Sequence, residues 1–240
     1  LTDLEAVVRH AGGGKVHLLG SSSGGGLAID YALAHPDGVH SLTLVGAVVG
    51  GFGYTRHMQT RGGHMTAEAR ADAAAERRYW STVDPYFAAP GSKAAHERIA
   101  AALEAFPHNL NPDPGRLAAY PPPALARLSS IRVPTLVLAG EHDIPDVHAH
   151  AGAIAAGIPH ARRAVLAGSG HAPYIEQPDD FVATILPFLQ NAPFLDVLDN
   201  QGAAAATGVL RAARATNRAA ILGVRLAGLT SRRPPGRSAR

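Results

Sequence analysis

A serine in a glycine-rich motif is the first residue of this sequence that could do chemistry. Residues 20–24, GSSSG, have the form G-x-S-x-G with Ser22 at the centre, and they lie between an apolar stretch and a stretch with helical spacing of apolar residues. A nucleophilic serine on a sharp strand-to-helix turn needs small neighbours two residues away, because larger ones would collide with the strained backbone. Gly20 and Gly24 meet that need. A flexible Gly/Ser linker is the alternative interpretation, and the flanking stretches disfavour it.

Two later residues could complete the set that a serine nucleophile requires, a base and an acid that orients the base. The candidate base, His171, lies in the segment GSGHAP, and the candidate acid, Asp143, lies in the segment GEHD. Both segments directly follow apolar stretches, and loops at the carboxyl ends of parallel strands face ligands. Glu141 and Asp146 are rivals for the acid, but Asp143 matches the expected position best. The chain order Ser, Asp, His is the one that accompanies a G-x-S-x-G serine.

The backbone beside the serine offers a group that could stabilise negative charge. The Ser23 amide lies at the N-terminus of the predicted helix, which favours an anion beside the Ser22 oxygen. His142, His148 and His150 raise the alternative of a metal site. No carboxylate and histidine spacing in this region forms a zinc set, so no metal is expected.

Strands are needed to position these residues, and the sequence predicts strands and helices in two separate parts of the chain. The first half predicts a helix at 3–11, a strand at 15–19, a helix at 25–34 and a strand at 39–48; the second predicts a strand at 135–139, a helix at 146–157, a strand at 164–166 and a helix at 179–189. The alternation predicts an α/β fold, with a mostly parallel sheet and helices on both faces.

A segment without strand signals separates the two halves. It contains helix-prone stretches at 66–80 and 93–106, and an exit with Pro112, Pro114, Pro121, Pro122 and Pro123. We therefore expect a core of residues 1–49 and 129–191, with residues 50–128 inserted as a helical cap or lid. Residues 192–240 are rich in Ala and Arg and low in complexity. We expect them to be a partly disordered tail outside the catalytic domain.

Composition excludes several classes of protein. Without cysteine the chain can have no disulfide, no thiolate metal site and no cysteine nucleophile. The formal charge of +3 is unevenly spread, because eight arginines and two aspartates give residues 192–240 a charge of +6 and leave −3 on residues 1–191. The basic balance therefore indicates no nucleic-acid partner for the site. No stretch approaches the roughly 18 apolar residues of a membrane span, and no secretion pattern opens the chain, so we expect a cytoplasmic enzyme without a membrane partner.

Three segments in one order, GSSSGG, IRVPTLVLAGEHD and GSGHAPYIEQPDDF, resemble the α/β-hydrolase superfamily in its lidded esterase and lactonase-like branch. The resemblance covers residues 1–191 and implies the α/β-hydrolase fold. It also implies that His171 takes the proton of Ser22, that Asp143 holds the imidazole tautomer, and that Ser22 attacks an ester-like carbonyl of a small molecule. Water then releases the acyl group. No cofactor is implied.

Related chemistries share this triad, so the reaction remains open among an ester, thioester or lactone hydrolase, a carbon–carbon bond hydrolase, an aminopeptidase and a cofactor-free haloperoxidase. A dehalogenase or an epoxide hydrolase would need aspartate at position 22. Phe52, Tyr54 and Trp80 are the candidates for substrate binding. The lid aromatics Tyr79, Trp80, Tyr86 and Phe87 could line an acyl pocket or pack the lid on the core.

The family normally has about four strands before the serine, whereas only 21 residues precede Ser22 here. We therefore expect a truncated member, with its first strands missing, one edge of the strand at 15–19 uncovered and the second oxyanion donor absent. A catalytically impaired remnant that acts as a binding protein is the second hypothesis. The sequence does not indicate the oligomeric state.

Overall fold

The fold is built on a central sheet, seen in a computed structural model that describes residues 1–60, 72–84, 86–88, 92–105, 122–191 and 222–224. Its strand order is β4-β3-β2-β1-β5. The strands are β1 (Val16–Ser21), β2 (Val39–Val45), β3 (Thr135–Gly140), β4 (Arg162–Leu166) and β5 (Leu222–Val224). The pairs β1–β2, β2–β3 and β3–β4 are parallel, so the carboxyl ends of these four strands meet at one edge of the sheet.

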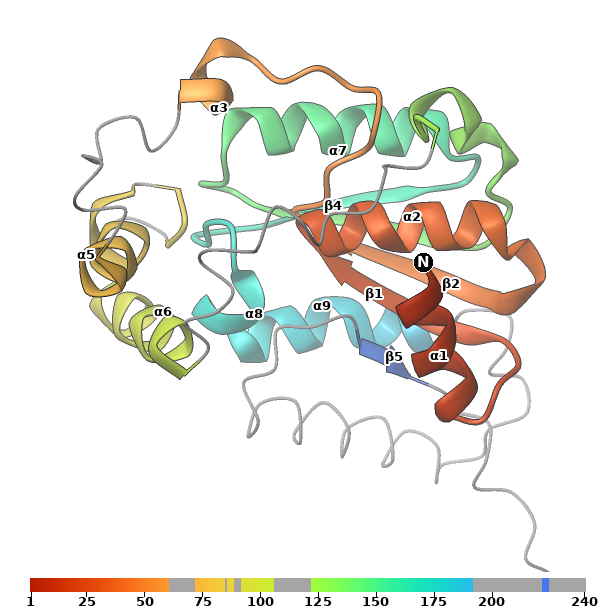
Figure 1. Ribbon diagram of the computed structural model, residues 1–240, viewed down its shortest axis with the longest axis horizontal. Helices are drawn as coiled ribbons and strands as arrows, with labels where there is room; N and C mark the ends of the chain where they lie inside the picture. The colour runs from red at the N-terminus through yellow and green to blue at the C-terminus, as the bar shows by residue number, and fades with distance from the viewer. Residues whose placement is uncertain (61–71, 85, 89–91, 106–121, 192–221, 225–240) are drawn as a thin grey trace, which may run out of the picture.

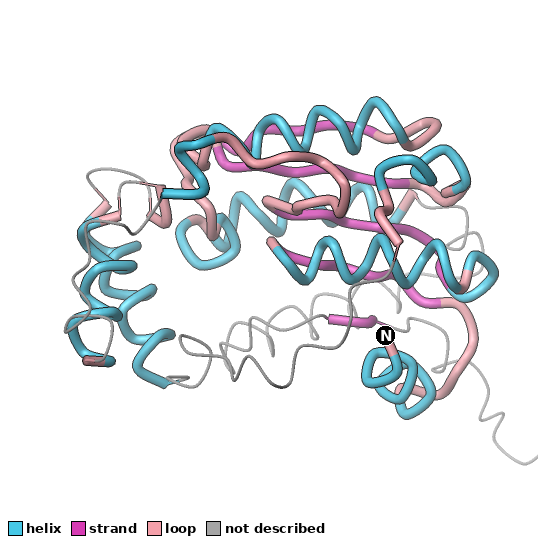
Figure 2. Tube along the Cα trace, turned by 45° about the horizontal axis from the view of Figure 1, so that its top comes forward, coloured by secondary structure: helices cyan, strands magenta, loops and turns pink. Residues whose placement is uncertain are grey.

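Helices connect the parallel strands and cover both faces of the sheet (Figures 1 and 2). They are α1 (Thr2–His10), α2 (Ser23–Ala34), α3 (Arg56–Thr60), α5 (Ala73–Arg78), α6 (Lys93–Ala105), α7 (Pro145–Gly157), α8 (Pro173–Glu176) and α9 (Pro178–Gln190). Shorter 3₁₀ turns lie at Pro36–Gly38 and Leu125–Ser130, and a π-helical turn lies at Tyr79–Val83. The predicted α/β fold, a mostly parallel sheet with helices on both faces, is confirmed.

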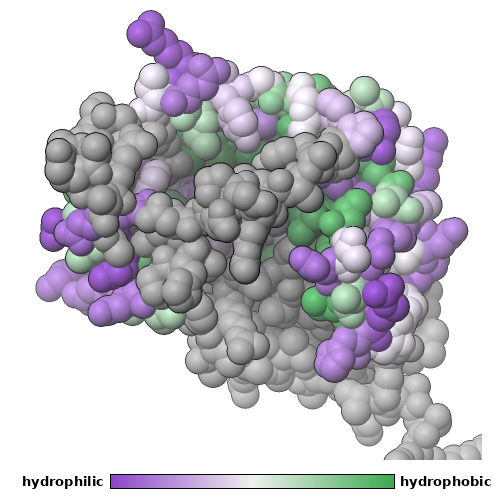
Figure 3. All heavy atoms as spheres, viewed as in Figure 1, coloured by the Kyte–Doolittle hydropathy of each residue, from purple (hydrophilic) through white to green (hydrophobic). Residues whose placement is uncertain are grey.

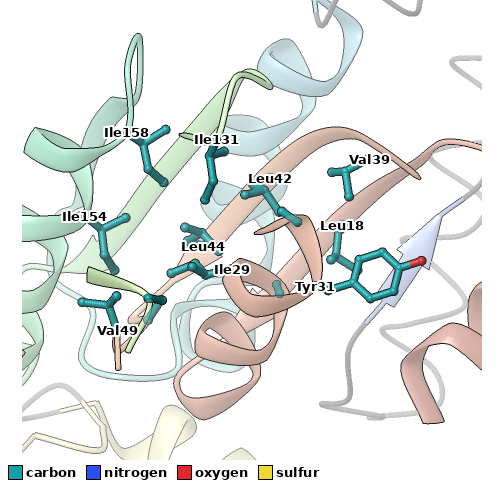
Figure 4. Close-up of a cluster of buried hydrophobic side chains, with 14 of the residues drawn as sticks. Leu18, Ile29, Tyr31, Val39, Leu42, Leu44, Val49, Ile131, Ile154 and Ile158 are labelled. Atoms are coloured by element: carbon teal, nitrogen blue, oxygen red, sulfur yellow. The ribbon is translucent and has the colours of Figure 1, made fainter. Parts of the chain in front are cut away.

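The larger hydrophobic core lies between the sheet and the helices α1, α2 and α7 (Figure 4). Leu18, Leu42 and Leu44 of the strands are each at most 1% exposed, and they pack with Ile29 of α2 and Ile154 of α7. A smaller core on the opposite face packs α9 on β2, β3 and β4. Because both faces are covered, the central strands are nearly continuous apolar runs, as buried parallel strands are.

The outer edge of β1 is partly paired, which corrects one expectation. β5 lies antiparallel to β1 along residues 17–19, with His17 opposite Val224 and Leu19 opposite Leu222. The prediction that this edge is uncovered is therefore wrong for these three residues. Residues 222–224, within the segment expected to be a tail, thus pair with the sheet as β5, and the rest of that segment lies outside the described residues.

The described part of the inserted segment is largely helical. α5, the π-helical turn and α6 lie together at one end of the molecule, next to α8 (Figure 1). The helix expected at 93–106 is present as α6, whereas the first part of the helix expected at 66–80 lies outside the described residues, as do Pro112, Pro114 and Pro121. In the same view hydrophilic side chains cover much of the described surface (Figure 3).

None of the helices in the described part of the chain combines the length and the apolar character needed to cross a bilayer.

A buried histidine in β1 links the stability of the fold to pH. His17 is 4% exposed, and its Nδ1 lies 2.7 Å from the Ser41 hydroxyl of β2. Burial first, and the nearby charge of His40 second, lower the pKa of His17 from 6.5 to about 4. In the folded protein His17 is therefore neutral at pH 6, where an unfolded histidine is largely protonated.

We predict that stability falls as the pH drops from 6.5 towards 4, because the unfolded state gains a proton at His17 that the folded state does not hold. Over this pH range His17 accounts for a loss of at most about 3 kcal/mol in the free energy of unfolding. Urea unfolding at several pH values should give a flatter pH dependence for the double variant His17→Leu/Ser41→Ala than for the wild type. The exposed His10→Gln variant is the control and should follow the wild type. Equal slopes for the double variant and the wild type would contradict the assignment.

Candidate active site

Ser22 lies on a strained turn between β1 and α2. Its φ is 53° and its ψ is −121°, and it is one of two non-glycine residues with positive φ in the described part of the chain. Such a conformation costs of order 1–3 kcal/mol and persists only where surrounding structure enforces it. Here the Ser22 amide donates to the Val45 carbonyl oxygen at 2.9 Å, which ties the turn to the end of β2.

Two glycines beside the serine are required by close packing. A Cβ atom on Gly20 would overlap the carbonyl group of Gly24, lying 2.7 Å from its carbon. A Cβ atom on Gly25 would lie 3.1 Å from the Cα of Ala47 and still closer to its Cβ. The turn therefore has no room for a side chain at Gly20, as predicted for a serine on a sharp turn, or at Gly25.

The Ser23 amide lies next to Ser22, at the first position of α2. An amide in the first turn of a helix has no carbonyl acceptor within the helix, so it is available to an anion. The orientation of α2 adds the positive end of the helix dipole at the same place. The predicted oxyanion donor thus lies beside the predicted nucleophile.

Asp143 and His171 form a buried pair. The loop after β3 carries Asp143 and the loop after β4 carries His171, and their side chains are joined by a 2.8 Å hydrogen bond between Oδ1 of Asp143 and Nδ1 of His171. The residues are 4% and 8% exposed. The Ile144 amide donates to the same carboxylate oxygen at 2.7 Å. Because the carboxylate accepts, Nδ1 of the neutral imidazole carries the proton and Nε2 is the basic nitrogen.

The rival acids have other roles in the structure. The Glu141 carboxylate accepts a hydrogen bond from the Gly168 amide at 2.8 Å, which ties the two site loops together. Asp146, in the first turn of α7, accepts from the amide and hydroxyl of Thr55 at 2.6 and 2.7 Å. Within the described residues neither of these carboxylates is hydrogen-bonded to His171, whereas that of Asp143 is.

Gly46, which was not predicted from the sequence as a site residue, lies between the serine turn and this pair. It directly follows Val45, whose carbonyl oxygen holds the Ser22 amide, and its own amide donates to the Leu138 carbonyl oxygen at 2.7 Å. Its φ is 53°, and a Cβ atom there would lie 3.1 Å from Oδ2 of Asp143 and 3.1 Å from both Nδ1 and Cε1 of His171. The Nδ1–Cε1 edge of the His171 imidazole thus lies against the backbone of Gly46, next to the serine turn. In the sequence Gly46 lay inside the strand predicted at 39–48, whereas that strand ends at Val45 in the structure.

The Ser22 hydroxyl makes no hydrogen bond to His171 within the described residues. Hydrogen bonds of this kind are often long or poorly aligned without substrate and tighten when substrate binds. What the fold provides is the placement of all three side chains at the carboxyl ends of parallel strands, where open α/β sheets bind ligands.

The candidates for substrate binding are separated in the structure. Phe52 and Tyr54 pack against His150 of α7, with ring centroids 4.8 and 5.0 Å away, and Phe52 also contacts the larger core. Trp80 of the lid contacts Phe87, whose ring lies 5.8 Å from that of His171. Phe87 therefore packs against His171, and Trp80 lies one ring further away.

Buried polar groups of α7 hold the loop that leads from β2 into the lid. The Val49 amide donates to Nδ1 of His150 at 3.0 Å, so the neutral ring carries its proton on Nε2. Burial lowers the pKa of His150, which keeps the ring neutral and able to accept. Together with the hydrogen bonds from Thr55 to Asp146, the bond to His150 fixes residues 49 and 55 of the segment that follows β2.

The described residues contain no cluster of three or more His, Asp or Glu side chains that could hold a metal ion. His142, His148 and His150 are not brought together: His150 is buried in the core, His142 lies beside Glu141, and His148 lies 3.5 Å from Arg163.

The chain is similar in sequence to curated proteins that are longer than itself. The chain is 31% identical over 200 residues to polyketide synthase ThaQ of Burkholderia thailandensis, covering 78% of this chain and 10% of that protein. It is 30% identical over 190 residues to the 2-hydroxy-6-oxononadienedioate/2-hydroxy-6-oxononatrienedioate hydrolase of Cupriavidus pinatubonensis, covering 74% of this chain and 63% of that protein. The chain thus spans less than two thirds of the length of either relative.

Solved structures and a family model agree on the fold. The esterase RhEst1 from Rhodococcus sp. ECU1013 superposes with a TM-score of 0.60 at 25% identity, over 79% of this chain and 70% of that one. The model of the alpha/beta hydrolase family matches residues 1–184. With this match, and with a strained serine turn and an Asp–His pair at the carboxyl ends of a parallel sheet, the chain belongs to the alpha/beta hydrolase family.

Proposed function

We propose that this chain is a serine hydrolase that cleaves a small ester, thioester or lactone through an acyl-enzyme. The observation that carries the proposal is the buried 2.8 Å pair of Asp143 and His171, whose imidazole edge lies over Gly46 beside the serine turn. A serine nucleophile requires such a base, held by such an acid. The similarity to the esterase RhEst1 supports the same class of substrate.

The proposed reaction uses each group in turn. Oγ of Ser22 attacks the carbonyl carbon while Nε2 of His171 takes its proton, and the oxyanion that forms accepts a hydrogen bond from the Ser23 amide. Collapse of this intermediate breaks the bond to the alcohol or thiol, which receives the proton from His171. A water molecule, activated by the same imidazole, then attacks the acyl-enzyme and frees Ser22. Asp143 keeps Nδ1 protonated and stabilises the imidazolium.

Carbon–carbon bond hydrolysis is the second candidate. The 30% identity to a hydrolase named for a 2-hydroxy-6-oxo dienedioate favours it, and a triad could serve both reactions. The third candidate is a non-catalytic binding protein, in which Ser22 would not react. Turnover of p-nitrophenyl butyrate compared with turnover of a 2-hydroxy-6-oxo dienoate separates the first two candidates.

We predict that a fluorophosphonate probe labels Ser22. Mass spectrometry of the labelled chain should place the adduct on the peptide containing Ser22, and Ser22→Ala should abolish it. Ser130→Ala, which changes an exposed serine in a 3₁₀ turn, is the matched control and should label at the wild-type rate. Persistent labelling of Ser22→Ala would refute the nucleophile, and an unlabelled wild type would favour the binding protein.

We predict that Gly46→Ala lowers the rate of hydrolysis by at least about tenfold. The new methyl group would meet Asp143 and His171 at 3.1 Å in a backbone conformation that disfavours L side chains, so the pair must move. A displacement of about 1 Å at a catalytic group can cost about 10²-fold in rate. Gly53→Ala is the control, because a Cβ atom there meets nothing within 4 Å. Equal kcat values for the two variants would show that the close packing at Gly46 is not needed.

A further inference from the structure

The loop that carries His171 is held by a buried carboxylate that the reaction itself does not use. Glu176, the last residue of α8, is 5% exposed. Its Oε2 accepts a hydrogen bond from the Gly170 amide at 2.9 Å, and its Oε1 accepts one from the Ala172 amide at 3.0 Å. The two oxygens therefore hold the amides on either side of His171.

The amide of His171 itself is held from the lid. It donates to the Tyr86 carbonyl oxygen at 2.9 Å, while the His171 side chain is bonded to Asp143. Three consecutive backbone amides, 170–172, thus have acceptors outside their own loop segment: Glu176 for the outer two and Tyr86 for the central one. A loop fixed at three consecutive amides has little freedom to change the direction of the Cα–Cβ bond between them.

A lid residue also holds the element that carries the carboxylate. Arg98 of α6 donates through Nε to the Ile175 carbonyl oxygen at 2.8 Å and through Nη2 to the Glu176 carbonyl oxygen at 2.5 Å. These carbonyl oxygens lie at the end of the single turn of α8, where the last carbonyls of a helix have no amide donor within that helix. Apolar contacts reinforce the arrangement, since Ala95 and Ile99 of α6 cluster with Ala172. α6, α8 and the histidine loop therefore pack as one unit.

From these contacts we propose that Glu176 is a positioning residue for His171, and that Arg98 connects this carboxylate clamp to the lid. The proposal rests on the function proposed above, in which His171 is the base. A carboxylate suits the role because it is an acceptor at both oxygens, and hydrogen bonds to a charged acceptor are about twice as strong as neutral ones. An amide side chain at position 176 would present a donor to one of the two backbone N–H groups.

The expected effect lies on the rate of the chemical step. Loss of the clamp leaves the triad side chains in place but loosens the backbone on both sides of His171, and small displacements of a catalytic group are costly. We expect Glu176→Ala to lower kcat for p-nitrophenyl butyrate by about 10- to 100-fold with KM within about twofold. Glu176→Gln keeps one acceptor and should fall between Glu176→Ala and the wild type.

The matched control is Glu104→Gln, which changes an exposed carboxylate on α6 and should keep the wild-type kcat. Arg98→Met tests the lid connection on the surface, where folding is little affected. It should lower kcat less than Glu176→Ala. All rates are referred to the folded fraction, measured by thermal unfolding followed through Trp80 fluorescence.

Hydrogen exchange supplies a readout that does not depend on activity. The His171 amide is bonded to Tyr86 and not to Glu176, so faster exchange of this amide in Glu176→Gln would show that the clamp stabilises the whole loop. Wild-type kcat per folded molecule, or wild-type exchange at the His171 amide, would overturn the proposal. If the wild type itself neither labels nor hydrolyses, the proposed function fails, while exchange still decides whether Glu176 holds the loop.

Discussion

The site depends on the absence of a side chain at position 46. Gly46 lies where the end of β2 meets the serine turn on one side and the Asp143–His171 pair on the other. A Cβ atom at position 46 would lie 3.1 Å from the side chains of both Asp143 and His171, so even a methyl group would have to displace this pair. Ser22, Asp143 and His171 follow three different strands, so this backbone contact helps to set their separations.

Around that contact, buried polar groups hold loops in place. Glu176 holds the two amides that flank His171, and His150 and Asp146 of α7 hold the segment that follows β2. Each group leaves a backbone donor satisfied that would otherwise be costly to bury. A loop held in this way keeps a catalytic side chain in one orientation, which an apolar loop of the same length would not.

The lid takes part in the site through both its backbone and its rings. Tyr86 accepts a hydrogen bond from the His171 amide, Phe87 contacts the imidazole, and Arg98 holds the end of α8. A change in the position of these residues would therefore also reach His171.

The sequence alone determined the chain order of β1 to β4 and of the helices α1, α2, α6, α7 and α9, because apolar periodicity is a local signal. It also selected Asp143 and His171, which the structure joins by a hydrogen bond, and Ser22, which it places on a strained turn. It missed the first residues of β4, since Arg162 and Arg163 are exposed on the edge of the sheet and carry no apolar signal. Only the tertiary structure decided the roles of Gly46 and Glu176 and the pairing of β5 with β1. Those roles exist because strands and loops far apart in sequence come within hydrogen-bonding or van der Waals distance, which no local pattern encodes.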